Sequence, residues 1–93
     1  MLRRISTHAI DQYMGRVDKR ISRYKVRVAL FHIYRIGHDA TCYEAKSIRH
    51  EDVDGETTLR IAETCFGLIV MPIKRGVMTT CWALEVWRRS EMQ

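Results

Sequence analysis

Three polar side chains spaced four residues apart carry the strongest chemical signal in this sequence. His8, Gln12 and Arg16 follow two hydroxyl residues, Ser6 and Thr7, which are suited to begin a helix. Side chains four residues apart lie on one face of a helix. An imidazole, an amide and a guanidinium in such a column could hold a phosphate and transfer a proton.

The same residue types are those that metal-independent RNA cleavage requires. That reaction needs a base, an acid and cations that stabilise the charge on the phosphorane. We predict that His8 transfers the proton, that Arg16 and Arg60 bind the phosphate, and that Thr79 projects from the sheet as a further polar group. The alternative is a histidine that only hydrogen-bonds backbone at a helix start, and a threonine that only favours β-structure.

Basic residues are concentrated in the N-terminal part of the chain. Residues 1–36 hold nine Lys and Arg against two Asp, whereas residues 37–93 hold seven against nine acidic residues, within a net charge of +5. Clustered guanidinium groups bind phosphates with salt-dependent affinity. We predict contacts to RNA or to a host nucleoprotein complex from five residues, Gln12, Lys19, Arg20, Arg23 and Arg27. A solvated basic face that serves only solubility is the alternative.

A second pattern interleaves cations and rings along one helical face, at Arg27, Phe31, Tyr34 and His38. Such a face can stack nucleic-acid bases. It is more often a packing face, and we favour packing against the sheet.

Several function classes lack their sequence signals. The chain has no phosphate-binding loop, dinucleotide fingerprint, nucleophile elbow or zinc-protease motif. Cys42, Cys65 and Cys81 contain no Cys-x-x-Cys pair, so we expect reduced thiols and neither metal nor cofactor. No apolar run approaches about 20 residues and no signal-peptide core follows the basic start, so we expect a cytoplasmic protein without a membrane partner.

Two helices are predicted to position the N-terminal polar residues, at 7–17 and 22–36. Ser22 is the expected N-cap of the second helix, and Gly37 is expected to end it with a positive φ. The apolar spacing within this helix predicts a buried stripe at Val26, Ala29, Leu30 and Ile33.

Strands are predicted for the rest of the chain, because the apolar period falls to two. We expect strands at 40–49, 57–63, 66–71 and 77–87, with Pro72 ending the third and a tight turn at 74–76. Residues 83–92 also suit a short amphipathic helix. The predicted fold is therefore one α+β domain, residues 1–93, with two N-terminal helices on one face of a four-stranded antiparallel sheet.

A family resemblance rests on ten residues, His8-Ala9-Ile10-Asp11-Gln12-Tyr13-Met14-Gly15-Arg16-Val17. With the later strands, this motif resembles small phage and bacterial proteins of the barnase–EndoU–colicin–RelE class of metal-independent ribonuclease domains. The resemblance implies that the family's histidine falls on His8, its later arginine on Arg16, and a strand-end Thr or Ser on Thr79 or Thr80. The family's usual intervening arginine falls on Gln12, a departure that favours binding without cleavage.

Two functions remain open. The first is a small phage- or mobile-element-type protein that binds nucleic acid or a host nucleic-acid-handling complex, as anti-CRISPR inhibitors do. The alternative is a RelE-like toxin, a metal-independent endoribonuclease that uses His8 and Arg16 and has a cognate antitoxin as partner. A dimerising subunit, using an exposed edge strand and the two tryptophans, is a third option. We favour binding over cleavage.

Overall fold

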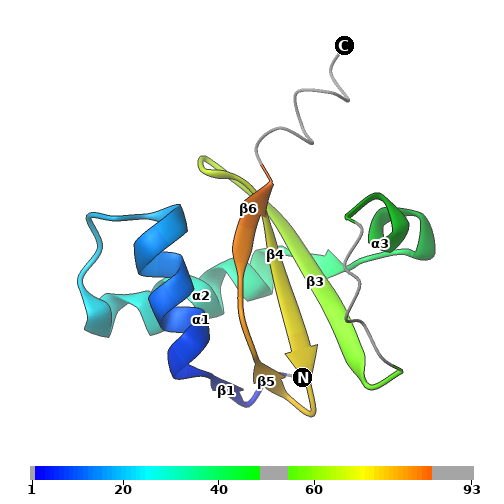
Figure 1. The fold of residues 1–93 in the computed structure, drawn as a ribbon, viewed down its shortest axis with the longest axis horizontal. Helices are drawn as coiled ribbons and strands as arrows, with labels where there is room; N and C mark the ends of the chain where they lie inside the picture. The colour runs from blue at the N-terminus through cyan, green and yellow to red at the C-terminus, as the bar shows by residue number, and fades with distance from the viewer. Residues whose placement is uncertain (1, 49–54, 85–93) are drawn as a thin grey trace.

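A mixed β-sheet forms the centre of the fold, with helices on both of its faces (Figure 1). The computed structural model describes residues 2–48 and 55–84. Across the sheet the strands follow the order β1 (Arg4–Ile5), β5 (Val77–Met78), β4 (Gly67–Lys74), β3 (Thr57–Thr64) and β2 (His38–Asp39), and β6 (Trp82–Leu84) also pairs with β4. The predicted α+β class is confirmed. The sheet differs from the prediction because it includes the short strands β1 and β2, and because β1 pairs with β5 in parallel.

Two core clusters lie on the two faces of the sheet. The larger one joins α1 (Thr7–Gln12), the π-helical turn η1 (Tyr13–Val17) and α2 (Arg23–Ile36) to β4 through buried residues such as Ile10, Leu30 and Met71. On the opposite face, α3 (Cys42–Ile48) packs Ala45 and Ile48 against the smaller cluster of Leu59, Ile61, Leu68 and Val70. Since both its faces are covered, β4 is buried from Gly67 through Ile73.

The predicted helix at 7–17 is confirmed in position, but its second half is a π-helical turn. Ser6 caps α1, because its Oγ accepts a hydrogen bond of 3.1 Å from the Ala9 backbone N–H. After Gln12 the chain widens into η1, where the Asp18 N–H donates to the Tyr13 carbonyl five residues earlier, at 2.9 Å. A π-helix has more residues per turn than an α-helix, so the four-residue spacing from Gln12 to Arg16 no longer matches one regular α-helical face.

The predicted helix at 22–36 is confirmed as α2, which begins after Ser22 and buries Val26, Leu30 and Ile33. The expected positive φ at Gly37 is wrong, since its φ is −87°. Gly37 is required by space. A Cβ at this position would overlap the carbonyl oxygen of Ile61 and lie 3.0 Å from the Ala62 Cβ.

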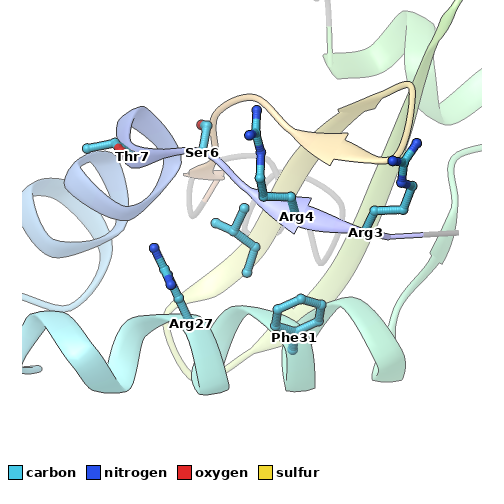
Figure 2. A pocket seen from close by; sticks show the side chains of 7 residues that line it. Arg3, Arg4, Ser6, Thr7, Arg27 and Phe31 are labelled. Atoms are coloured by element: carbon cyan, nitrogen blue, oxygen red, sulfur yellow. The ribbon is translucent and has the colours of Figure 1, made fainter.

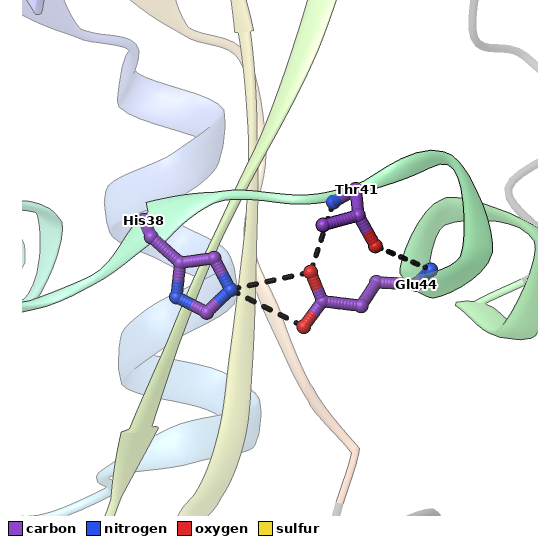
Figure 3. A network of polar contacts seen from close by, with 3 residues as sticks. All are labelled: His38, Thr41 and Glu44. Atoms are coloured by element: carbon purple, nitrogen blue, oxygen red, sulfur yellow. Dashed lines mark hydrogen bonds and ion pairs between the residues drawn. The ribbon is translucent and has the colours of Figure 1, made fainter.

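The predicted strand at 40–49 is wrong, because residues Cys42–Ile48 form the helix α3. Its first turn is closed by a reciprocal capping box (Figure 3). The Thr41 N–H donates to the Glu44 carboxylate at 2.9 Å, and the Glu44 N–H donates to the Thr41 hydroxyl at 3.1 Å. His38 Nε2 lies 3.2 Å from each Glu44 oxygen and ties this cap to β2.

Pro72 does not end its strand as predicted, because β4 continues to Lys74. In a strand, the N–H and C=O of one residue point to the same side. The Pro72 carbonyl accepts from the Thr79 N–H at 3.0 Å, so its missing N–H faces the interruption between β5 and β6, where no ladder bond is needed. The same interruption splits the predicted last strand into β5 and β6.

The tight turn at 74–76 is confirmed. Arg75 and Gly76 both have positive φ, 53° and 78°. Positive φ at both positions gives a two-residue hairpin loop the same twist as its flanking strands. Residues 49–54 and 85–93 lie outside the described residues. Most of the predicted helix alternative at 83–92 falls there, while residues 83 and 84 belong to β6.

Candidate functional site

A groove runs between α2 and the segment formed by β1 and the start of α1. Its main hollow has a volume of about 460 Å³, and an adjoining hollow of about 400 Å³ shares Thr7 and Arg27 with it. A third hollow of about 390 Å³ shares Arg3 and Arg4 with the first. We call this surface the arginine groove and define it by seven side chains: Arg3, Arg4, Arg23, Tyr24, Arg27, Phe31 and Arg75.

One wall of the arginine groove comes from the exposed side of α2. Arg23, Arg27 and Phe31 follow one another at four-residue intervals, so they form a column along the helix. The buried stripe of Val26, Leu30 and Ile33 fixes the rotation of α2 against the sheet. Figure 2 shows that the Arg27 side chain and the Phe31 ring rise from α2 toward β1.

The opposite wall comes from the first residues of the chain. The backbone N–H groups of Arg3 and Arg4 both donate to the Gly76 carbonyl, at 2.6 and 3.1 Å, and thereby anchor this segment beside the β4–β5 turn. Ile5 is buried in the core. In Figure 2 the guanidinium groups of Arg3 and Arg4 point away from α2, whereas Arg27 lies on the other side of β1. The positive charges therefore lie on both sides of the short strand.

The arginine groove is positively charged without acidic lining residues. In the described part of the chain, the three hollows are lined by five arginines and no Asp or Glu. Two of the arginines already have acidic partners outside the lining. Arg23 pairs with Asp11 at 2.6 Å, and Arg75 pairs with Glu56 at 3.1 Å.

Arg3, Arg4 and Arg27 form no ion pair within residues 2–48 and 55–84, although all three are exposed. Unpaired guanidinium groups beside one another repel, and a polyanion relieves this repulsion by binding several of them at once. The groove can therefore bind an extended anion, with these three arginines as the principal contacts.

The predicted catalytic residues are not brought into one site. His8 is exposed at the start of α1, next to Thr7 of the groove. Arg16 lines a separate hollow of about 340 Å³ with Val17, Cys65, Phe66 and Ala83. Among the described residues, no hydrogen bond or ion pair joins His8, Gln12 and Arg16. His8 and Arg16 therefore lie on one segment of the sequence, but the fold places Arg16 in a hollow apart from the groove beside His8.

Arg60 has local partners at the end of α2. Its Nε donates to the Tyr34 carbonyl at 2.9 Å, a terminal NH donates to Asp39 at 3.2 Å, and its guanidinium lies 4.5 Å from the centre of the Tyr34 ring. Its side chain is only 19% exposed. These contacts fasten the end of α2 to β2 and β3, and they occupy the guanidinium that was predicted to bind phosphate.

Thr79 is half-buried in the connection between β5 and β6. Its carbonyl accepts from the Ser6 hydroxyl at 2.9 Å, and its own hydroxyl lies 3.4 Å from the Pro72 carbonyl. This arrangement links the cap of α1 to the sheet.

The predicted binding residues divide between the arginine groove and its surroundings. Arg23 and Arg27 belong to the groove. Lys19 and Arg20 are exposed in the connection between η1 and α2, and Gln12 is half-buried at the end of α1.

The predicted packing face of α2 is only partly a packing face. It was predicted to comprise Arg27, Phe31, Tyr34 and His38, and these residues have different surroundings. Tyr34 packs against the core, Phe31 opens into the groove with 37% of its surface exposed, and His38 bonds Glu44.

Sequence reasoning missed Arg3, Arg4 and Arg75 as groove residues. All three lie where β1 pairs with β5. This pairing joins residues that are more than 70 positions apart in the sequence. The adjacent arginines at positions 3 and 4 were a visible signal of charge. Nothing in their local pattern indicated which distant elements they would lie beside.

Two titratable core residues have pKa values shifted by burial. Burial raises the pKa of the Cys81 thiol to about 12, and its Sγ lies 3.4 Å from the Ala9 carbonyl. Burial, followed by the nearby Asp18 carboxylate, raises the pKa of Tyr13. Since both side chains are almost fully buried, these shifts arise from packing, and Cys81 has no route to act as a nucleophile.

Within the described residues, no group of three His, Cys, Asp or Glu side chains is placed to hold a metal ion. Among the helices of residues 2–48 and 55–84, none combines the length and the apolar composition that a membrane span requires. Comparison of the chain with protein families, with curated proteins and with solved structures finds no significant match.

Proposed function

We propose that the protein binds nucleic acid, with RNA as the preferred ligand, through the arginine groove. The observation that carries this proposal is that one hollow, which also presents an aromatic ring, is lined by Arg3, Arg4 and Arg27, three arginines that form no ion pair among the described residues and lie on the two sides of β1. Phosphate groups are the ligands that clustered guanidiniums favour, because each planar fork matches two phosphate oxygens.

The charge distribution supports the same proposal. The 14 residues of α2 include four cations, three Arg and one Lys, and no acidic residue. An acidic protein surface could also meet these cations. The aromatic ring inside the hollow favours nucleic acid over a carboxylate-rich surface, because bases stack on rings.

A charge-reversal experiment tests this function. Arg27→Glu should weaken binding of a labelled RNA of about 12 nucleotides by a factor of roughly ten to a hundred, the value of one lost charged contact. Lys46→Glu is the matched control, because Lys46 is exposed on α3 at the opposite face of the sheet and the charge change is the same. Fluorescence anisotropy measures both.

If Arg27→Glu and Lys46→Glu lose the same affinity for RNA, the loss is due to the change in net charge alone. That result would contradict a binding site at the groove. Absence of binding by the unmodified protein at low salt would remove the function itself. In that event an acidic host protein becomes the better candidate partner.

A second candidate function is metal-independent RNA cleavage. The observation that favours it is the position of His8, which is exposed and directly follows a residue that lines both main hollows of the groove. A strand held in the groove would pass an imidazole suited to proton transfer near neutral pH.

This candidate is tested by incubating RNA with the protein and a metal chelator. The candidate is supported if cleavage disappears in His8→Ala and persists in His32→Ala. His32 is a matched control because it is also an exposed histidine, but it lies on α2. Undiminished cleavage by His8→Ala would refute the role of His8.

A further inference from the structure

We propose that the arginine groove takes a single strand of nucleic acid, with one unpaired base stacked on Phe31 and the flanking phosphates held by Arg27 and Arg4. This inference rests on the proposed function and specifies its ligand class. It follows from the position of one ring inside the charged hollow.

Phe31 lies at the wall of the main hollow, between α2 and β1. It is 37% exposed, and Figure 2 shows its ring directed from α2 toward β1. Ile5, the neighbouring apolar residue of the lining, contributes to the same hollow from β1. Because Ile5 is buried and Phe31 is 37% exposed, a flat apolar group that enters the hollow meets mainly the aromatic ring.

Cations flank this apolar hollow. Arg27 precedes Phe31 by one helical turn and also points toward β1, while Arg4 extends on the far side of β1. A nucleotide has the same division into a flat, mainly apolar-faced base and an anionic linkage on either side. The arrangement therefore fits a base in the hollow with phosphates at its two rims.

The ring is accessible only to an unpaired base. In a duplex, both faces of a base pair are covered by neighbouring pairs, and only the edges are exposed in the grooves. The hollow of about 460 Å³ falls within the range of roughly 300–1,000 Å³ typical of small-ligand sites, which suits one nucleotide and is too small for a helix.

A second phenylalanine provides a matched comparison. Phe66 is also 37% exposed and also lines a hollow with an arginine, Arg16. That hollow contains one arginine, whereas the main hollow of the groove contains three. If exposure of a ring alone caused stacking, both phenylalanines would contribute equally to binding.

The experiment compares Phe31→Leu with Phe66→Leu on a single-stranded RNA and on an RNA duplex, each of about 12 nucleotides per strand. Phe31→Leu should weaken single-strand binding by about tenfold and duplex binding by no more than about twofold, because only the single strand stacks. Phe66→Leu should leave both affinities within about twofold of the unmodified protein. Phe31→Tyr should retain single-strand binding.

A spectroscopic signature tests stacking independently of affinity. Phe31→Trp should gain fluorescence quenching on single-strand binding beyond that of the unmodified protein, since a stacked base quenches the added indole. Single-stranded DNA serves as competitor. Preferential binding of RNA assigns a ribose-containing strand to the groove, and equal competition assigns a single strand of either sugar; both results support the inference.

Three results would overturn the inference or its basis, and they are distinguishable. Unchanged single-strand affinity in Phe31→Leu, together with loss of binding in Arg27→Glu, overturns base stacking and leaves the proposed function intact. Equal losses for single strand and duplex in Phe31→Leu also overturn it. If neither Arg27→Glu nor Phe31→Leu changes binding, the proposed function fails together with the inference.

Discussion

The two helices on opposite faces of the sheet, α2 and α3, are stabilised in different ways. α2 has 14 residues and buries three side chains in the larger core, yet the side chain of its N-cap residue Ser22 makes no capping hydrogen bond. α3 has seven residues, packs the partly buried Ala45 and Ile48 against the sheet, and is closed by a reciprocal capping box. The comparison indicates that packing holds α2 in place and that its outer face is free to present arginines and a ring.

The largest expected loss of stability follows from a substitution on the buried side of α2. Leu30 is fully buried, so Leu30→Ala should lower the free energy of unfolding by about 2–5 kcal/mol. Arg27→Ala, one helical turn earlier on the exposed side, should change it by no more than about 0.5 kcal/mol. Urea unfolding of the two variants measures this difference. Similar losses in both would contradict the division of α2 into a packing face and a binding face.

A smaller loss of stability is expected where α2 joins the sheet. Gly37→Ala places a Cβ against the Ile61 carbonyl, so it should destabilise the protein by about 1–3 kcal/mol. The matched control is Gly15→Ala in η1, where nothing lies within 4 Å of the added Cβ. That change should be neutral or stabilising by about 0.4–1 kcal/mol, because alanine restricts the unfolded chain. Thermal melting measures both, and a neutral Gly37→Ala would contradict the close approach of backbone to backbone.

The smallest expected loss of stability follows from a substitution in the N-terminal cap of α3. The Thr41 N–H, followed by His38, holds the pKa of Glu44 below its usual value of 4.5, although burial acts in the opposite direction. Because the pKa is lower in the folded protein, this stabilisation is present above pH 4.5 and is lost as the pH falls through the folded value.

Glu44→Gln should therefore destabilise the protein at neutral pH by roughly 1 kcal/mol or less, with a difference that shrinks below pH 4.5. Urea midpoints measured from acid to neutral pH follow this change. A difference that stays constant across that range would show that the carboxylate charge is not what closes the cap.

The contrast between the two helices also explains what could be predicted from the sequence. α2 was found because Val26, Leu30 and Ile33 repeat with the period of a helix over about two turns. α3 was mistaken for a strand because seven residues are too few for a clear period. Its signal was the spacing of Thr41 and Glu44, a capping box that the alternating pattern nearby concealed.

The candidate site was predictable only in part, because its two walls are brought together by the pairing of strands that lie far apart in the sequence. The charge of Arg23 and Arg27 was evident from the sequence, and both lie in the groove. The arginines at positions 3 and 4 come to line the same hollow as Phe31 because a two-residue strand pairs in parallel with β5. No local pattern encodes that contact. The π-helical turn at Tyr13–Val17, which includes Arg16 of the predicted column, is not anticipated by the periodicity of a single sequence.

The most direct test of nucleic-acid binding at the arginine groove is the salt dependence of affinity. Single-strand binding is measured over a range of salt concentrations for the unmodified protein, Arg27→Ala and Lys46→Ala. Each phosphate contact contributes about 0.7 to the slope of log affinity against log salt, so Arg27→Ala should reduce the slope by about 0.7 while Lys46→Ala leaves it unchanged. Equal slopes for all three proteins would contradict binding of the phosphate backbone at the groove.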